Sequence, residues 1–349
     1  MPSKKSSLRM GGPGEISTSP FRRFPEVVDA IGGSSRGVFK DAGISLEQFA
    51  YEDNHLAYMD VARLFNTAFE HTQCPHIGLL IGERFSLENL GPVGQLMRLA
   101  TTPGDALNDL VGHANLYDRG ATPLLLPLAG QHSLLGYVIY RHDLPNQSLL
   151  VDTAVMVGLQ MLRALLGANW TPVRVQFSYR KPSDITPYVR KFRCNIQFNA
   201  SISGLVINNQ QLRQIQCTAN PRLHHLLKLA ISIATSHLTF SEKIKSQAYV
   251  LLLQGQANSK HIASQFSLNE RTLRRRLDAE GSHLKELITD SRSNFARQLL
   301  KDTDLPISTI SQTLQYQDPN AFSRAFKTWT NTSPQHWRNG LGGGASIGG

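Results

Sequence analysis

The sequence predicts an α+β N-terminal domain, built from helices and an antiparallel sheet, followed by an all-α C-terminal domain with two helix-turn-helix units. The chain has 349 residues, which is enough for two ordinary hydrophobic cores. Apolar residues recur at helical spacing in the first and last thirds, whereas the middle contains short runs typical of strands. The net charge of +10 is uneven: residues 24–219 carry 15 Lys and Arg against 16 Asp and Glu, whereas residues 220–349 carry 16 against 9. A basic final third favours a polyanionic partner.

The two ends of the chain are expected to lie outside both domains. Residues 1–23 hold five Lys and Arg against one Glu, and no apolar stretch follows their lysines. This composition predicts a disordered basic tail and not a secretory signal. Residues 340–349 are rich in glycine and predict a flexible tail.

Cysteine usage and hydropathy predict a cytoplasmic protein. The three cysteines, Cys74, Cys194 and Cys217, are odd in number and form no CxxC pair, which favours a reducing compartment over a disulfide scaffold. Gln160 and Arg163 interrupt the apolar stretch that contains them, so no run approaches the roughly 18 apolar residues of a membrane span. We therefore expect no membrane partner.

The N-terminal region begins with a helical part. Residues 24–115 are expected to be mainly helical, because residues such as Val61 and Phe65 lie on one face at helical spacing. Residues 122–147 combine turn residues with apolar runs, which predicts a β-hairpin. Residues 148–167 then predict a buried helix that ends at its final glycine.

Two further segments predict strands. Within residues 171–182, Val173, Val175 and Phe177 alternate with polar residues, as in a strand. One or two more strands are expected around residues 199–204. Together with the hairpin, these segments predict a mixed α+β domain with an antiparallel sheet.

From Pro221 onward the pattern is helical throughout. A connecting helix is expected first, and the next helix is expected to open at Ser241 and close at Gly255. A long helix follows over residues 283–300, where apolar residues stripe one face.

Residues 260–278 have the pattern of a helix-turn-helix. A first helix ends at a turn that begins at Ser267, and Asn269 is suited to cap the second helix. Leu273 and Leu277, four residues apart, would anchor the second helix to the core. The second helix of such a motif lies in the major groove of DNA.

The same pattern recurs at residues 308–329. Asp318 followed by Pro319 is a strong helix start, and Phe322 and Phe326 repeat the four-residue apolar spacing. The long helix between the two units would hold their second helices at a fixed separation. If that separation is about one turn of DNA, both can enter successive major grooves on one side of the duplex.

Residues of about 240–338 resemble the DNA-binding domain of the AraC/XylS family of bacterial transcription regulators. The resemblance rests on the run LPISTISQTLQYQDPNAFSRAFKTWTNTSPQHWR, which is similar to the family's second helix-turn-helix and its closing signature. The signature positions are Asn331, Ser333, Pro334, Trp337 and Arg338.

The chain departs from this family at a few turn positions. Ser311 stands where the family usually has alanine, and Ser267, Gln315 and Asn331 stand where it has glycine. A left-handed residue other than glycine costs about 1 kcal/mol, so these residues would weaken the local turns without excluding them.

The N-terminal region resembles the arabinose-binding-type domain of the ornithine-utilisation-regulator-like branch of the same family. This resemblance rests on FPEVVDAIGG, ENLGPVGQLMRLATTPGDALNDL and NWTPVRVQFSYRKPSDITPYVRKFRCNIQFN, and the name of the domain does not establish that a sugar binds here. The expected parts of the chain are a disordered basic tail (1–23), a ligand-sensing or dimerisation domain (24–216), a linker helix (217–240), a DNA-binding domain with two helix-turn-helix units (241–339) and a flexible Gly-rich tail (340–349).

The candidate DNA contacts lie on the exposed faces of the two second helices. A run of charge on a helix is usually a solvated face, but its place in a helix-turn-helix within the basic third of the chain favours DNA. Arg324 and Asn320 are the base-reading candidates of the second unit, Lys327 suits a phosphate, and Arg276 suits a structural role. The full candidate set is Arg271, Thr272, Arg274, Arg275, Asn320, Ser323, Arg324 and Lys327.

A polar aromatic cluster is the candidate effector site of the N-terminal domain. Residues of this kind more often pack within a sheet or at its rim. The apolar run LLLPLAG (124–130) beside them suits either the wall of a cavity or the core. The cluster is Tyr117, Arg119, Tyr137, Tyr140 and Arg141.

We expect no metal, no cofactor and no catalytic residue. His224 and His225 are adjacent, and no carboxylate or cysteine joins them at ligand spacing. Cys74 precedes Pro75 and His76, which is not the Pro-Cys-His-Arg order of DNA-repair proteins that carry this DNA-binding module, so a buried structural thiol is favoured.

Three functions follow, in order of preference. The first is a sequence-specific transcription regulator that binds double-stranded promoter DNA, acts on RNA polymerase and responds to a small-molecule effector. The second is a ligand-independent regulator whose N-terminal domain only forms a homodimer or binds a partner protein. The third, a DNA-repair or DNA-modifying enzyme, requires a catalytic constellation that the sequence does not show.

Overall fold

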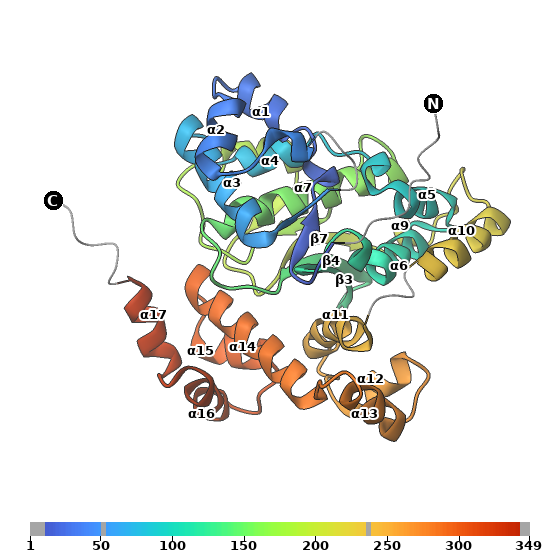
Figure 1. Ribbon diagram of the computed structural model, residues 1–349, viewed down its shortest axis with the longest axis vertical. Coiled ribbons are helices and arrows are strands. Elements are labelled where there is room, and N and C mark those ends of the chain that lie inside the picture. Colours follow the sequence, from blue (N-terminus) through green and yellow to red (C-terminus); the bar gives the residue numbers. More distant parts are fainter. Residues whose placement is uncertain (1–10, 50–53, 235–238, 343–349) are drawn as a thin grey trace.

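The structure is a computed structural model that describes residues 11–49, 54–234 and 239–342 (Figure 1). Strand β1 (Glu15–Ser17) pairs antiparallel with β2 (His55–Ala57), and Phe21 is buried. The disordered tail expected over residues 1–23 is therefore wrong from residue 11 onward, because backbone pairing and burial of Phe21 order this segment. Residues 1–10 lie outside the described residues.

The N-terminal part combines helices with a five-stranded sheet. Local signals explain several of their starts: Thr102 and Asp105, for example, form a reciprocal capping box at the start of α6. Short 3-10 turns occupy 19–21, 46–49, 87–90 and 114–116. The helices are α1 (Phe24–Ala30), α2 (Ser35–Ala42), α3 (Tyr58–Thr72), α4 (Ile77–Gly82), α5 (Gly91–Leu99), α6 (Pro103–His113), α7 (Gln147–Leu166), α8 (Thr186–Phe192) and α9 (Asn209–Leu212).

The sheet has the strand order β3-β4-β7-β5-β6. Its strands are β3 (Ala121–Leu128), β4 (His132–Ile139), β5 (Arg174–Gln176), β6 (Asn195–Gln197) and β7 (Ser203–Asn208). The expected hairpin is β3–β4, and it turns through Gly130 and Gln131, both with positive φ.

The sheet departs from the expected antiparallel arrangement at one pair. Strands β5 and β6 are parallel, because helix α8 lies between them in the chain and returns it in the same direction. One or two strands were expected around residues 199–204. The structure has two, β6 before this segment and β7 from residue 203 onward, and Asn199 between them is left-handed (φ 54°).

Helix α7 lies across one face of the sheet (Figure 1). It ends before Gly167, as expected, and the glycine adopts a positive φ of 111°. Among the described helices, α7 alone is long and apolar enough to cross a membrane by length and composition, contrary to the expectation that no run approaches that length. In this fold most of its apolar stretch is buried between the sheet and helices α3 and α4.

The C-terminal part is helical throughout its described residues. Thr239 caps α11 through a reciprocal capping box with Glu242, so this helix begins earlier than the expected Ser241. Helix α17 runs through the start of the expected Gly-rich tail, and residues 343–349 lie outside the described part. The helices are α10 (Pro221–Ala234), α11 (Phe240–Leu253), α12 (Ser259–Gln265), α13 (Glu270–Asp278), α14 (Leu284–Asp302), α15 (Ile307–Thr313), α16 (Pro319–Thr330) and α17 (Pro334–Gly342).

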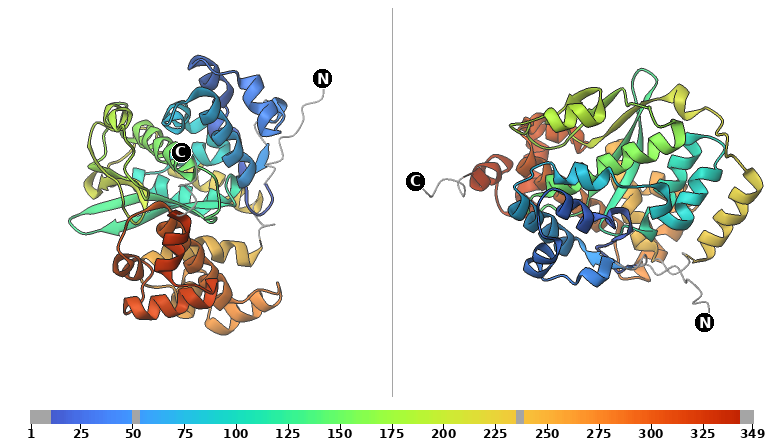
Figure 2. Two further views of the ribbon diagram at one scale, coloured as in Figure 1. Left: turned by 90° about the vertical axis from the view of Figure 1, so that its left-hand side faces the viewer. Right: turned by 90° about the horizontal axis from the view of Figure 1, so that it is seen from above.

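Helices α11 and α14 cover the second face of the sheet, opposite α7 (Figures 1 and 2). The rings of Tyr140, at the end of β4, and Tyr249, in α11, stack with their centroids 4.9 Å apart. The two expected domains therefore share one hydrophobic core across this face. Its buried members are Leu124, Leu126, Leu134, Val138, Tyr140, Ile202 and Val206 from the N-terminal part, and Tyr249, Leu252, Phe295, Ala296, Leu299, Leu300, Ile310, Leu314, Phe322 and Phe326 from the C-terminal part.

Candidate functional site

The first helix-turn-helix consists of α12 and α13. Ser267 adopts the left-handed conformation at the turn, with φ 53°. Asn269 caps α13, where its side-chain oxygen accepts a hydrogen bond from the Thr272 amide at 2.8 Å. Leu273 and Leu277 are each 1% exposed, so the expected anchoring side of α13 is confirmed.

The outer side of α13 carries the arginine cluster. Arg271, Arg274 and Arg275 are exposed, and none of the described carboxylates forms an ion pair with them. The Arg276 guanidinium lies 5.5 Å from the centre of the Phe240 ring, a cation–π contact that fits the structural role expected for it. Thr272 is half-buried. Three cationic side chains are thus free to meet an anionic surface.

The second unit consists of α15 and α16 and repeats this geometry. Gln315 is left-handed at the turn (φ 62°), and the Asp318 carboxylate caps α16 by accepting the Ala321 amide at 2.8 Å. Phe322 and Phe326 are fully buried, as expected. The two units therefore differ in sequence but share a left-handed turn residue, a capped second helix and two buried anchor residues four positions apart.

The outer side of α16 is polar. Asn320, Arg324 and Lys327 are exposed, whereas Ser323 is half-buried and its hydroxyl donates to the Pro319 carbonyl at 2.8 Å. Sequence reasoning thus places three of the four candidates on the open face. Ser323 still has lone pairs for an incoming donor.

The closing signature stabilises the second unit from behind. Asn331 ends α16 in the left-handed conformation, with φ 58°. The Trp337 ring packs 5.9 Å from the Phe326 ring, centroid to centroid, and the Arg338 guanidinium donates to the Leu305 carbonyl at 2.8 Å. Trp337 and Arg338 thus attach α17 to α16 and to the segment before α15, on the side of the unit away from the exposed face of α16.

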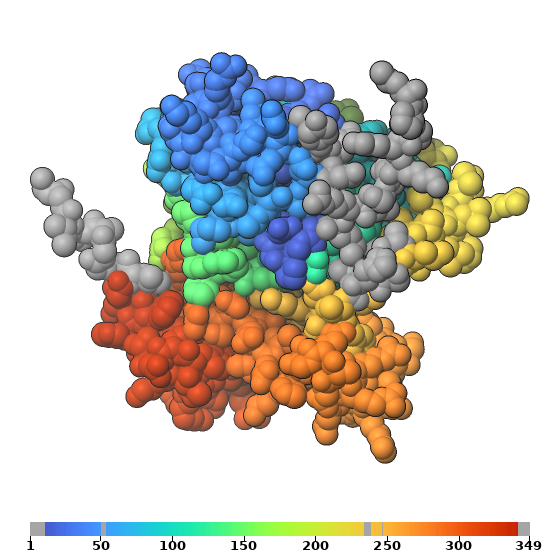
Figure 3. All heavy atoms as spheres, in the orientation of Figure 1, coloured from blue at the N-terminus to red at the C-terminus, as the bar shows by residue number. Residues whose placement is uncertain are grey.

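Helix α14 connects the two units. It contains 19 residues and is therefore about 28 Å long. Helices α13 and α16 lie toward its opposite ends, and the two units form the lower edge of the molecule, orange and red in Figure 3. The buried side of α14 includes Phe295 and Leu299, so the shared core fixes this connection.

A cavity of about 130 Å³ lies between α7 and the inner face of the sheet. Tyr117 and Tyr137 of the expected effector cluster line it, together with Tyr58, Asp118 and many apolar residues. Arg119, Tyr140 and Arg141 do not line it, so the structure brings together two of the five expected residues.

Asp118 is the polar centre of the cavity wall. Its Oδ1 accepts hydrogen bonds from the amides of Gly120 and Ala121 at 3.0 and 2.9 Å, and its Oδ2 accepts from the hydroxyls of Tyr58, at 2.7 Å, and Tyr137. Burial raises the pKa of Asp118, and the hydrogen bonds from Tyr137 and Tyr58 act in the opposite direction. Burial and then the Asp118 charge raise the pKa of both tyrosines well above the usual value.

Sequence reasoning missed Asp118 and Tyr58. Asp118 lies between two named candidates, but a period-two pattern cannot tell which of neighbouring loop residues points inward. Tyr58 comes from the start of α3, 60 positions earlier, and no local signal links the two.

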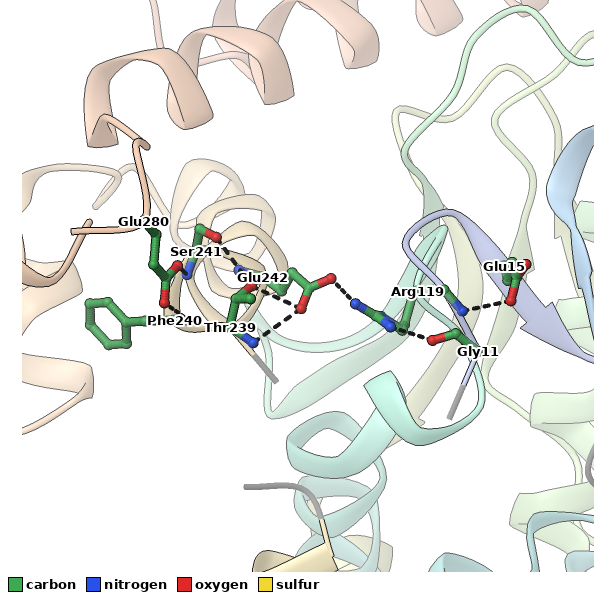
Figure 4. Close-up of polar contacts among 9 residues, drawn as sticks. Gly11, Glu15, Arg119, Thr239, Phe240, Ser241, Glu242 and Glu280 are labelled. Carbon is green, nitrogen blue, oxygen red and sulfur yellow. Dashed lines mark hydrogen bonds and ion pairs between the residues drawn. The ribbon is translucent and has the colours of Figure 1, made fainter. Parts of the chain in front are cut away.

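Arg119 lies at the boundary between the two parts of the chain (Figure 4). Its guanidinium forms an ion pair with Glu242 of α11 and donates to the Gly11 carbonyl, and its side chain is only 16% exposed. The second carboxylate oxygen of Glu242 accepts from Thr239, and Glu280, just after α13, accepts the amides of Phe240 and Ser241 at 2.7 and 2.8 Å (Figure 4). A continuous polar chain thus joins the loop beside the cavity to the first helix-turn-helix.

Tyr140 and Arg141 also lie away from the cavity. Tyr140 points to the other face of the sheet, where it stacks on Tyr249 and Lys245 lies 5.2 Å from its ring centre. Arg141 is exposed and pairs with Asp143, with Nε 2.9 Å from Oδ1. The alternation of side chains along β4 explains the correction, because Tyr137 and Tyr140 are three residues apart and face opposite sides.

Comparison with known proteins agrees with this architecture. Residues 32–215 match the family model described as the arabinose-binding domain of AraC transcription regulator, N-terminal, and residues 262–340 match a helix-turn-helix domain. The chain is 25% identical over 292 residues to the HTH-type transcriptional regulator VirS of Mycobacterium tuberculosis, covering 82% of this chain and 85% of VirS. It is 23% identical over 317 residues to the ornithine utilization regulator of Pseudomonas aeruginosa, covering 90% and 93%.

A solved structure is also similar. The transcriptional regulator CdpR from Pseudomonas aeruginosa matches at 21% identity with a TM-score of 0.44, covering 87% of this chain and 96% of CdpR. The N-terminal family model by itself spans more than half of the 349 residues, and the helix-turn-helix model matches residues 262–340 of the C-terminal part. The chain belongs to the AraC family and is a DNA-binding transcription regulator.

Proposed function

We propose that the two recognition helices, α13 and α16, bind one promoter site in successive major grooves, and that a small molecule in the cavity adjusts this binding. The observation that carries the proposal is the position of the sheet. One face lines the cavity and the other packs against α11 and α14, which hold the recognition helices. A ligand that favours one arrangement of the sheet would thereby favour one arrangement of the DNA-binding surface.

The proposed DNA contacts divide by chemistry. Arg271, Arg274, Arg275 and Arg324 are suited to bidentate contacts with guanine edges, and Asn320 is suited to adenine. Lys327, Ser323 and Thr272 are suited to phosphate oxygens, which position the protein without reading sequence. The length of α14, about 28 Å, is of the order of one turn of DNA, about 34 Å, which supports entry into neighbouring grooves.

The test is capture of fragmented bacterial genomic DNA by the full-length protein at about 150 mM salt, which is near physiological ionic strength. We expect recovered fragments to share a site with two half-motifs about 10 base pairs apart. Arg274→Ala/Arg275→Ala should relax the first half-motif and Arg324→Ala the second. Arg213→Ala, an exposed arginine of the N-terminal part, serves as the control and should leave the site unchanged. Uniform recovery that collapses as salt rises would contradict sequence reading.

We also propose that the regulator forms a homodimer through α10. One side of this helix contacts α5, and Asp109 of α6 holds it through His224 and Lys228, at 2.6 and 2.7 Å. The opposite side exposes Leu223, Leu226, Leu229 and Ile233, of which Ile233 is 74% exposed. Leu223, Leu226, Ala230 and Ile233 follow the heptad spacing of a helix that packs against its own copy.

Sedimentation equilibrium tests this dimer. Leu226→Glu should shift the protein to monomer, because two charges would be buried in the pair, whereas Leu46→Glu, at an exposed leucine elsewhere, should not. A wild-type protein that stays monomeric at micromolar concentration would exclude the dimer.

The remaining partners and the compartment follow from the same proposal. A regulator at a promoter acts on RNA polymerase in the bacterial cytoplasm. The enzymatic alternative has no observation in its favour: burial raises the pKa of the Cys74 thiol and raises that of Cys194 to about 11, which disfavours a thiolate nucleophile.

A further inference from the structure

The cavity beside α7 is small. Its volume of about 130 Å³ is slightly below the roughly 150 Å³ of an engineered apolar cavity that remains dry and binds benzene. A ligand that fits inside it is therefore limited to about one aromatic ring or a short alkyl chain.

The wall of the cavity is largely apolar. Helix α7 contributes Leu150, Val157 and Met161 on one side, and Leu135 and Leu205 of the sheet lie opposite. A polyhydroxylated ligand would lose its hydrogen bonds to water here and would find few replacements, which is costly for every buried hydroxyl.

The polar groups on the wall are already engaged with one another. Asp118 accepts four hydrogen bonds, Tyr117 donates its hydroxyl proton to the Leu90 carbonyl, and the Thr153 hydroxyl lies 2.9 Å from the Leu149 carbonyl. The hydroxyls of Tyr58 and Tyr137 both hydrogen-bond to Asp118 and also lie within hydrogen-bond distance of each other, so only acceptor capacity remains for a ligand. The wall can thus satisfy about one hydrogen-bond donor on a ligand.

The charge of the wall excludes anions. Asp118 is buried there, and none of the described residues that line the cavity is Lys, Arg or His. A carboxylate would meet a buried carboxyl group without a counter-ion, which is strongly unfavourable. The same argument excludes free amino acids, whose carboxylate would have no partner.

We propose that this cavity binds an uncharged, largely apolar molecule of about one ring, with at most one hydrogen-bond donor directed at Tyr58 and Tyr137. A sugar does not fit this description, although the matching family model has arabinose in its name. The inference rests on the proposed function only in treating the cavity as the effector site; binding itself can be tested without DNA.

The test uses the full-length protein with benzene, phenol and indole as probes, and with L-arabinose, L-ornithine and hexanoate as comparison compounds. At about ten times its dissociation constant, each apolar probe should raise Tm by about 2 °C, because it binds the folded state alone. The comparison compounds should leave Tm unchanged. Saturation-transfer NMR confirms direct contact between probe and protein.

Two substitutions locate the binding. Ala154→Phe places a ring in the cavity from α7 and should abolish the shift with indole, and Ala114→Leu, a smaller filling change from another wall, should weaken it. Ala164→Phe is the matched control, because Ala164 is exposed on the same helix and does not line the cavity. It should bind indole as the wild type does. Circular dichroism of each variant shows that the fold is retained.

The outcomes separate the two proposals. Saturable binding of L-arabinose or L-ornithine that Ala154→Phe removes would overturn the ligand class and leave the sensing function in place. Absence of binding by all three apolar probes would also overturn the proposed ligand class, whatever the result of the DNA capture. If the probes bind in the cavity but leave DNA affinity unchanged, the ligand class stands and the effector role of the proposed function fails.

Discussion

At the scale of single residues, three turn positions connect sequence to structure directly. Ser267, Gln315 and Asn331 stand where the family has glycine, and all three have a positive φ. A comparison of residue types thus predicted a backbone conformation. The chain retains the turns although each such residue costs about 1 kcal/mol, because the buried residues on either side determine the path of the backbone.

Replacing Ser267 with glycine tests this cost. Ser267→Gly should raise the free energy of unfolding by about 1 kcal/mol, since glycine adopts a left-handed φ without strain. Ser264→Gly makes the same change inside α12, three residues earlier, and should lower it by about 0.5 kcal/mol. Urea midpoints measure both. If both substitutions changed the free energy of unfolding in the same direction, the left-handed φ of residue 267 would not be the cause of the stabilisation.

At the scale of elements, Asp152 joins α7 to α8. The hydroxyls of Tyr179 and Tyr188 both donate to its carboxylate, the latter at 2.7 Å, and burial raises its pKa to about 7. Because the unfolded chain releases this proton near pH 4, the folded state holds one more proton between about pH 4 and 7. Stability from this group is therefore greatest below pH 4 and is lost as pH rises to 7.

The Asp152→Asn variant should lose this dependence. Between pH 5 and 8, the wild type should lose more stability than the variant, by an amount on the order of 2–3 kcal/mol. Asp184→Asn, at an exposed carboxylate of the same region, should follow the wild type in this range. If the urea midpoints of wild type and Asp152→Asn changed equally with pH over this range, Asp152 would not be the group that causes the pH dependence.

Elements were predictable where their signals are local. Helices α13 and α16 begin at the capping residues expected, Asn269 and Asp318, because a cap acts within three residues of itself. Strand β1 was missed because it has three residues and its partner lies about 40 positions away. The parallel pairing of β5 and β6 was missed for the same reason: strand direction depends on a crossover, which period-two patterns do not report.

At the scale of the whole molecule, the sequence indicated two domains but not how they meet. The apolar runs of β3 and β4 predict a hairpin, but they cannot say what covers each face of its sheet. The same limit applies to the effector cluster, of which only Tyr117 and Tyr137 line the cavity. Arg119 was expected beside them and instead reaches α11.

Arg119→Ala should loosen the contact between the two parts. Loss of the partly buried ion pair with Glu242 should speed hydrogen exchange of the first amides of α11 about tenfold, equivalent to about 1.4 kcal/mol of local stability. Arg141→Ala removes an exposed pair on the neighbouring strand end and should change exchange there little. Equal exchange in Arg119→Ala and wild type would show that the packing of Tyr140 on Tyr249 suffices.

The shared core also limits how this regulator can be recombined with its relatives. Domains exchanged as cassettes must bring compatible surfaces, and here Leu124, Leu126, Leu134 and Val138 face α11 and α14. In a chimera with the N-terminal half of this chain and the DNA-binding half of another protein, these four residues would pack against side chains that do not match them. Successful hybrids, in the laboratory or in evolution, would have to inherit the outer positions of the sheet together with the helices that cover them.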